Sequence, residues 1–297
     1  MKLAWEDRIL HGFIYVFLTA LGLLFLYPFW NALMISFNIG ADTALGGITI
    51  WPRAFTLENY EVVLQDARLL RAFYISVMRT LAGTVLGVLL TAMFGYAMSK
   101  KELLGRKYYM ILCVITMYFS GGLIPSYLLI RSLGLRNSFW VMVIPGLINV
   151  WHMIIFRTFF MGLPSGLEES AKLDGANHFQ IFFRIVLPLS GPVIATIALF
   201  TAVHHWNSWF DASIYITQEN LLPIQTLLNQ IINSNIATQQ LQNVSGAAAD
   251  FLEMNQRVTT RSLIMSTMMV ATIPIILVYP FLQRYFVKGV LIGSLKE

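Results

Sequence analysis

Six long apolar stretches constrain what this chain can fold into more than any other feature. They cover Ile9–Ile35, Ala72–Met98, Tyr109–Ile130, Phe139–Phe160, Pro192–Ile216 and Leu263–Phe286. Each can cross about 30 Å of hydrocarbon as a helix that rises roughly 1.5 Å per residue. Hydrophobic residues make up 57% of the chain and charged residues 12%, against about 45–50% and about 25% in soluble domains. We therefore predict an all-α membrane protein, with residues 1–297 forming one domain of six transmembrane helices.

The charge on the loops sets the expected direction of these spans. Residues 99–107 follow the second span and carry the cations Lys100, Lys101, Arg106 and Lys107. Short cationic loops stay on the cytoplasmic side, and an even number of spans then places both termini in the cytoplasm. The net charge of +5 is explained by this bias. We predict no nucleic-acid partner, because the sequence has no basic stripe with interleaved aromatic residues.

The chain lacks the sequence patterns of an enzyme or of an ion-coupled carrier. It has no Gly-x-x-x-x-Gly-Lys-Ser/Thr loop for ATP phosphates and no His-Glu-x-x-His pattern. Asp and Glu are absent from the middle of every predicted span, whereas ion-coupled carriers use such residues as relays. Cys113 is the single cysteine and the five histidines are mostly scattered, which argues against a metal site. We predict no catalytic residue, no metal and no cofactor bound by this chain.

A polar segment over residues 163–190 separates the fourth span from the fifth. Ser165 and Glu168 have the spacing of a capping box, which predicts a short helix beginning after Pro164–Ser165. Gly175 can adopt the left-handed conformation that ends a helix. Asn177 can then cap a second helix. The pattern predicts two short helices joined by a turn, on the cytoplasmic side.

The two short helices differ in character. The first is polar and would offer Glu168, Glu169 and Lys172 to a partner, whereas the second would be anchored to the protein by Phe182, Phe183 and Ile185. The alternative is an ordinary loop between two spans.

Two sets of residues inside the spans are candidates for the path of a substrate. Arg79 is a lone cation in the second span. A charge inside a membrane indicates a functional site by default, although Arg79 is close enough to the external end to snorkel. The other set lies in the outer half of the fifth span, where aromatic rings can stack on sugars and polar groups can bind hydroxyls. It comprises His204, His205, Trp206, Asn207, Trp209 and Asp211. The alternative for this set is an aromatic belt at the membrane interface.

The predicted external segment 217–261 contains a second amphipathic pattern. Ile224, Leu227, Leu228, Ile231 and Ile232 recur at helical spacing. Such a helix can lie on the membrane surface, or it can form a docking surface for an external partner. The pattern leaves both possibilities open.

The spacing in the cytoplasmic segment is that of one family. Glu169-Ser170-Ala171 is followed by three residues, Gly175, nine residues, Ile185, one residue and Leu187-Pro188. The family pattern is Glu-Ala-Ala, three residues, Gly, nine residues, Ile, one residue and Leu-Pro, so Ser170 is the one departure. With Leu57–Tyr60, Gly121–Pro125, Trp206–Trp209 and Tyr285–Gly289, the chain resembles carbohydrate-importing ABC permeases of the maltose-transporter type over almost its whole length. The run Phe119–Tyr127 resembles the branch that handles complex oligosaccharides, including uronate-containing ones.

This resemblance implies a type I ABC importer permease fold in the bacterial cytoplasmic (inner) membrane. The expected partners are a second homologous permease in a heterodimer, two copies of a cytoplasmic ATPase that binds ATP and Mg, an extracytoplasmic solute-binding protein, an oligosaccharide and membrane lipid. A coupling helix would lie between spans four and five and seat in the ATPase. Its candidate residues are Glu168, Glu169, Ser170, Ala171, Lys172, Asp174, Gly175 and Ala176.

Two other functions remain as alternatives. One is a permease of the same family for amino acids, phosphate or metal chelates, and transport assays with labelled substrates would separate it from a sugar permease. The other is a carrier or membrane enzyme that works alone, which would be active without an ATPase.

Overall fold

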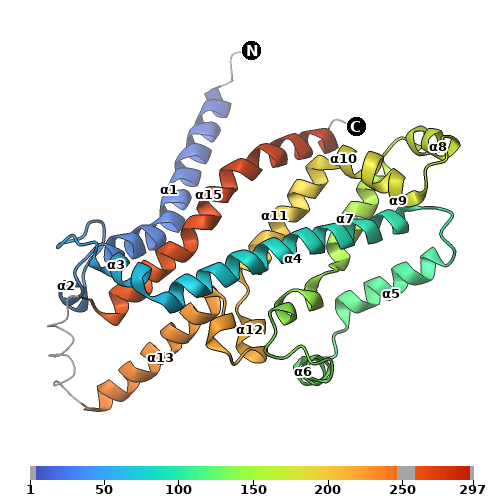
Figure 1. The fold of residues 1–297 in the computed structure, drawn as a ribbon. Coiled ribbons are helices and arrows are strands. Elements are labelled where there is room, and N and C mark those ends of the chain that lie inside the picture. The colour runs from blue at the N-terminus through green and yellow to red at the C-terminus, as the bar shows by residue number, and fades with distance from the viewer. Residues whose placement is uncertain (1–4, 246–257, 295–297) are drawn as a thin grey trace. The chain divides into compact units, whose positions relative to one another are not determined.

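The helices and 3-10 or π-helical turns make up all the regular secondary structure in the described part of this protein. The computed structural model describes the backbone of residues 5–245 and 258–294, and the side chains of residues 5, 7–234 and 258–277. Within these residues there is no strand, which confirms the all-α prediction, and extended segments pair only at a bridge between Asn38 and Phe55. The elements (Figure 1) are α1 Trp5–Ser36, α2 Gly40–Ala44, α3 Glu58–Gln65, α4 Ala67–Ser99, α5 Arg106–Tyr118, α6 Leu123–Ser132, η1 Phe139–Met142, η2 Ile144–Gly146, α7 Val150–Met161, α8 Ser165–Leu173, α9 His178–Ile181, the π-helical turn η3 Phe182–Val186, α10 Leu187–Leu189, α11 Gly191–Asn207, α12 Phe210–Tyr215, η4 Glu219–Leu221, α13 Ile224–Ser245 and α15 Thr260–Ser294.

In the part of the chain that the structure describes, three helices are long and apolar enough to cross a membrane on their own. They are Asp7–Ser36 within α1, all of α4, and Thr260–Leu277 within α15. Three further pairs reach that length only together and are bent: α5 with α6 by 113°, η1–η2 with α7 by 48°, and the α9–α10 segment with α11 by 85°. Up to six spans result if each bent pair is counted as one. The arrangement of all six in a membrane stays a prediction.

The fifth apolar stretch is not one continuous helix. Instead α11 ends at Asn207, Ser208 is extended, and α12 begins at Phe210. The break is stabilised by a side chain from another helix, because Arg79 Nη1 donates to the Ser208 carbonyl at 2.9 Å. Such a partner supplies the hydrogen bond that the interrupted helix no longer makes.

The chain divides into two compact units, which we describe separately. The first contains Met1–Leu70 and Leu228–Ile273. Its extended segment after α1 is organised by Asn59, a fully buried residue whose amide donates to the carbonyls of Ser36 and Asn38, each at 2.9 Å. These two bonds fix the path of the chain between α1 and α3.

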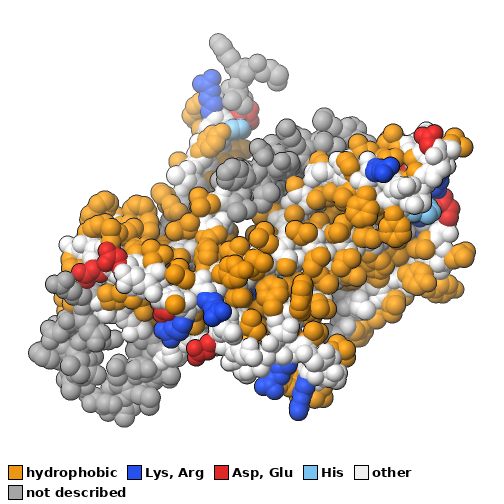
Figure 2. Space-filling view, viewed as in Figure 1, with side chains coloured by type: hydrophobic (Ala, Val, Ile, Leu, Met, Phe, Trp, Pro, Cys, Tyr) orange, Lys and Arg blue, Asp and Glu red, His pale blue; other side chains and the backbone are white. Residues whose placement is uncertain are grey.

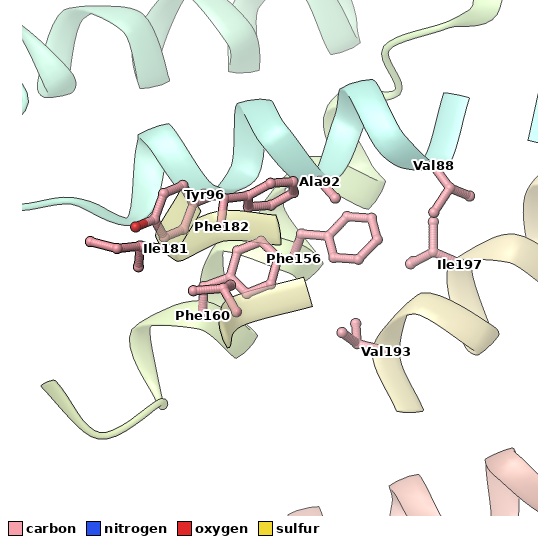
Figure 3. Close-up of a cluster of buried hydrophobic side chains, with 10 residues drawn as sticks. Val88, Ala92, Tyr96, Phe156, Phe160, Ile181, Phe182, Val193 and Ile197 are labelled. Carbon is pink, nitrogen blue, oxygen red and sulfur yellow. The ribbon is translucent and has the colours of Figure 1, made fainter. Parts of the chain in front are cut away.

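The second unit contains Arg71–Leu227 and Pro274–Glu297. Its main apolar core joins α4, α7, the α9–η3 segment and α11, and Figure 3 shows aromatic and aliphatic side chains meeting between these helices. The Tyr96 ring lies 6.1 Å from Phe160 and 5.3 Å from Phe182, measured between ring centroids. At Gly95 the helices approach so closely that a Cβ would lie 2.8 Å from the Cβ of Phe156. This core fixes the α9–η3 segment to α4 and α7.

The surface is as apolar as the composition predicts. Figure 2 shows hydrophobic side chains over most of the visible face, with few charged ones. The described side chains of α1 from Trp5 to Trp30 are almost all exposed in the isolated chain. Wide apolar surfaces of this kind belong in lipid or against partner helices.

The amphipathic pattern after the fifth stretch forms a helix, as predicted. The helix α13 extends from Ile224 to Ser245 and is therefore longer than the pattern, which ended at Ile232. Ile224 and Leu228 are buried, and the Ile224 N–H donates to Ser76 Oγ at 2.9 Å. Residues 246–257 of the predicted external segment, and the side chains from 235 onward in α13, lie outside the described residues. The role of this segment stays a prediction.

Candidate functional site

The predicted cytoplasmic segment contains both short helices, but the first begins differently from the prediction. The N-cap of α8 is Pro164, and no side chain caps the helix. Ser165 lies within the first turn, so the expected capping box with Glu168 was wrong. Glu168 instead accepts a hydrogen bond from Lys100 Nζ, at the end of α4. Its carboxylate therefore points toward the body of this unit.

The end of α8 follows the prediction. Gly175 has φ of +79°, and its N–H donates to the Lys172 carbonyl at 3.0 Å. The Ala176 N–H donates to the Ala171 carbonyl at 2.9 Å. These two bonds form a Schellman motif, in which a left-handed residue satisfies the last carbonyls of the helix. A residue with a side chain would be strained at this φ.

The second short helix begins with the capping box that the sequence predicts. The Gln180 N–H donates to Asn177 Oδ1 at 2.9 Å, and the Asn177 N–H donates to Gln180 Oε1 at 2.8 Å. The anchoring of this segment was only partly predicted. Phe182 is buried as expected, whereas Phe183 is exposed and Ile185 is half-buried.

Other residues of the segment supply the rest of the anchor. Ile181 and Val186 are buried with Phe182 in the core. The buried residues differ from the predicted ones because η3 is a π-helix. Its turn contains more residues than an α-helical turn, which changes the side chains that face inward.

The eight coupling candidates fall into three groups. Glu168 is half-buried and paired with Lys100, while Ala171 and Ala176 pack against the core. The others are exposed: Glu169, Ser170, Lys172, Asp174 and Gly175. These five therefore form a polar surface that a partner could contact.

The structure also exposes apolar side chains in this segment that sequence reasoning did not assign. Leu173 is 90% exposed, and Leu167 and Phe179 are exposed as well. The signal in the sequence was the position of Leu173 four residues after Glu169, which places both on one face of a helix. Phe179 also lines a cavity of about 420 Å³ together with Tyr96, Lys100 and Phe182. In Figure 1, α8 and α9 lie at the same end of this unit as the C-terminal end of α4.

Arg79 lies inside the protein and pairs with another of the predicted residues. Its side chain is 1% exposed and donates to the Asp211 carboxylate as well as to the Ser208 carbonyl. Asp211 also accepts from Ser208 Oγ at 3.2 Å and from the Ala212 N–H at 2.8 Å. Arg79 is therefore buried, and its charge is balanced by Asp211 within the chain. Its contact with a substrate stays a prediction.

The remaining candidates of the fifth stretch divide between two faces. His204, Asn207 and Trp209 line a cavity of about 400 Å³, together with Val203, Ser208 and Phe210. His205 and Trp206 are buried on the other face. The Trp206 ring meets Phe73 edge-on, with the ring centroids 5.7 Å apart. The 100° rotation per residue in a helix separates neighbours in this way.

His205 packs into a gap in α4 that Gly83 provides. A Cβ built at Gly83 would lie 2.3 Å from His205 Nε2, so a side chain at this position has no room unless the ring moves. In the residues that the structure describes, no three His, Cys, Asp or Glu side chains come together in a way that could hold a metal ion.

Comparison with known proteins identifies the family. Residues 67–292 match the family described as "Binding-protein-dependent transport system inner membrane component". The chain belongs to this family. It is 39% identical to the polygalacturonan/rhamnogalacturonan transport system permease protein YtcP of Bacillus subtilis (strain 168), over 98% of this chain and 99% of that protein. It is also 38% identical to Protein LplC of the same organism, over 95% of this chain and 92% of that protein.

Solved structures agree with this assignment. One chain of a bacterial ABC transporter involved in the import of the acidic polysaccharide alginate matches with a TM-score of 0.84 and 28% identity, over 96% of this chain and 99% of that one. Another, from the bacterial alginate transporter in complex with an alginate pentasaccharide-bound periplasmic protein, matches with a TM-score of 0.50 and 15% identity, over 94% of this chain and 95% of that one, and supports the fold alone. The resemblance to sugar-importing permeases is thus confirmed.

Proposed function

We propose that this chain is a non-catalytic permease subunit that moves an acidic oligosaccharide across the bacterial cytoplasmic membrane. An ATPase on the cytoplasmic side would supply the energy, with ATP and Mg bound by that partner. A second permease would complete the pathway as a heterodimer, and an extracytoplasmic binding protein would deliver the sugar. Both termini would lie in the cytoplasm.

The observation that carries the coupling role is the surface of α8. Glu169, Ser170 and Leu173 lie at helical spacing and are all exposed, while Ala171 attaches the opposite face to the core. A short helix that is fixed on one side and exposed on the other can transmit a movement of a bound partner. The Schellman motif at Gly175 ends this helix at a defined residue.

The relatives support an acidic sugar as the substrate, and a cavity in this chain supports a sugar of any charge. YtcP carries polygalacturonan or rhamnogalacturonan in its name, and the similar solved chain comes from an alginate importer. The cavity at the end of α11 combines the ring of Trp209 with the polar groups of His204 and Asn207. Aromatic faces and hydrogen-bonding groups of this kind suit a sugar ring and its hydroxyls. We assign substrate contact to these three residues rather than to the buried Arg79.

The test is reconstitution of the complete transporter in liposomes with its second permease, ATPase and binding protein. Uptake and ATP hydrolysis are measured with a galacturonate pentasaccharide and with the neutral galactose pentasaccharide. We expect the acidic sugar to drive both activities and the neutral sugar to drive neither. Equal activity with the two sugars would refute selection for charge. Activity with an amino acid, and with neither sugar, would refute the carbohydrate assignment.

A further inference from the structure

An ion pair joins the end of α4 to the first turn of α8. Lys100 directly follows α4, and its ammonium donates to the Glu168 carboxylate. Both side chains are mostly covered, at 19% and 17% exposed. By contrast, the Arg68 side chain in its ion pair with Asp66 is 73% exposed. The contact between Lys100 and Glu168 is therefore more than a solvated surface pair.

The ammonium of Lys100 also lies over the face of an aromatic ring. Lys100 Nζ lies 4.1 Å from the centroid of the Tyr96 ring, one helical turn earlier in α4. Tyr96 is itself buried in the core against Phe160 and Phe182. A cation over an aromatic face is attracted electrostatically, and more strongly where water is excluded. The position of the ammonium is thus set by the core rather than by a flexible side chain alone.

The rest of α8 has few attachments of this kind. None of its residues is fully buried, and no side chain caps its N-terminus. Leu163 just before the helix, Ala171 within it and Ala176 after it pack against the core. Glu168 is in the first turn, so its ion pair holds the helix between Leu163 and Ala171.

We propose that Lys100 and Glu168 are positioning residues that make the end of α4 follow α8. This inference rests on the proposed function of α8 as the helix that contacts the ATPase. A movement of α8 would then reach the second span through the ion pair as well as through the core. In this arrangement Glu168 serves contacts within the permease, whereas its exposed neighbour Glu169 is free to face the ATPase.

The test uses charge reversal in the complete reconstituted transporter. Lys100→Glu and Glu168→Lys each place like charges together, whereas the double variant restores an opposite pair with the order reversed. The readout is the ratio of binding-protein-stimulated to basal ATP hydrolysis, measured alongside the amount of ATPase that co-purifies. We expect each single variant to lower the ratio on the order of tenfold, within the usual range of coupling between sites, with the ATPase still bound. The double variant should recover most of the loss.

Two further variants separate positioning from a general effect of charge or folding. Lys101→Glu changes an exposed neighbouring lysine and should leave the ratio unchanged. Lys100→Arg keeps the cation and should retain most of the coupling. If the double variant is no better than the single ones, or if Lys101→Glu is equally harmful, the proposal is overturned.

Hydrogen exchange makes the result independent of transport. In the purified complex, each single variant should speed the exchange of backbone amides in residues 165–175, and the double variant should slow it again. This pattern would support the tether even if the wild-type complex failed to couple ATP hydrolysis to sugar, in which case only the proposed function would fall. Unchanged exchange in both single variants would refute the tether.

Discussion

Replacing Asp211 with alanine removes the carboxylate that balances the most deeply buried charge in the described part of the chain. Arg79 is 1% exposed and would keep the Ser208 carbonyl as its remaining partner. Removing one member of a buried ion pair costs about 3–5 kcal/mol, because the other charge stays buried without compensation. Asp211 is 27% exposed, which favours the lower end of that range.

A loss of about 3 kcal/mol changes the ratio of folded to unfolded protein by more than about a hundredfold. At roughly 2–4 °C per kcal/mol for larger domains, the melting temperature should fall by about 6–12 °C. The assay is thermal unfolding of the purified permease pair in detergent, followed by loss of monodisperse protein. Arg68→Ala is the matched control, since it breaks an ion pair in which the arginine is 73% exposed. Such an exposed pair contributes at most about 1 kcal/mol.

A double variant tests whether the uncompensated charge is the cause. Arg79→Met with Asp211→Ala removes both charges, and replacement of a buried pair by apolar groups is often neutral or stabilising. It should therefore melt well above Asp211→Ala alone. A melting temperature for Asp211→Ala within the range of the Arg68→Ala control would refute the reasoning. So would a double variant that is less stable than the single one.

Three other outcomes follow from the geometry. Gly83→Ala should destabilise the protein by about 1–3 kcal/mol, as overpacking does. Adding His205→Ala in the same chain should restore most of the melting temperature. A Gly83→Ala protein as stable as the wild type would contradict the close packing. Gly175→Pro should abolish uptake while the protein stays in the membrane, because proline fixes φ near −65° and the native φ is +79°; normal uptake would disprove the need for this turn. Trp209→Ala should raise the sugar concentration for half-maximal uptake by up to about tenfold, in line with loss of an aromatic stacking contact, and leave basal ATP hydrolysis unchanged. Unaltered uptake kinetics would remove Trp209 from the sugar path.

Local chemistry explains which features of the cytoplasmic segment could be predicted from the sequence. The cap formed by Asn177 and Gln180 involves residues three positions apart. The turn at Gly175 depends on a residue type that tolerates positive φ. Both are decided within a few residues, so a pattern in the sequence is sufficient to predict them.

The partners of the charged residues could not be predicted in the same way. Arg79 and Asp211 are 132 residues apart, and Lys100 and Glu168 are 68 apart. Arg79 and Asp211 were both recognised as candidates for the substrate path, but their pairing depends on how α4 packs against the start of α12. A sequence that shows the two charges but not the packing suggests two separate functional sites. The structure shows that the two charges balance each other.

The position of Glu168 shows that a shift of one residue in the start of a helix changes a functional assignment. The sequence predicted that the Glu168 carboxylate forms a capping box with Ser165 at the start of its own helix. It also predicted that Glu168 and Glu169 are both offered to a partner. Because α8 begins at Ser165, with Pro164 at the N-cap position and no side-chain cap, Glu168 instead reaches Lys100. The 100° rotation to the next residue turns Glu169 outward. Two adjacent glutamates thereby have different surroundings, since Glu168 pairs with Lys100 and Glu169 is exposed. With α8 proposed as the helix that contacts the ATPase, a Glu169 variant should release the ATPase while α8 keeps its hydrogen-exchange protection. A Glu168 variant should lose that protection and keep the ATPase.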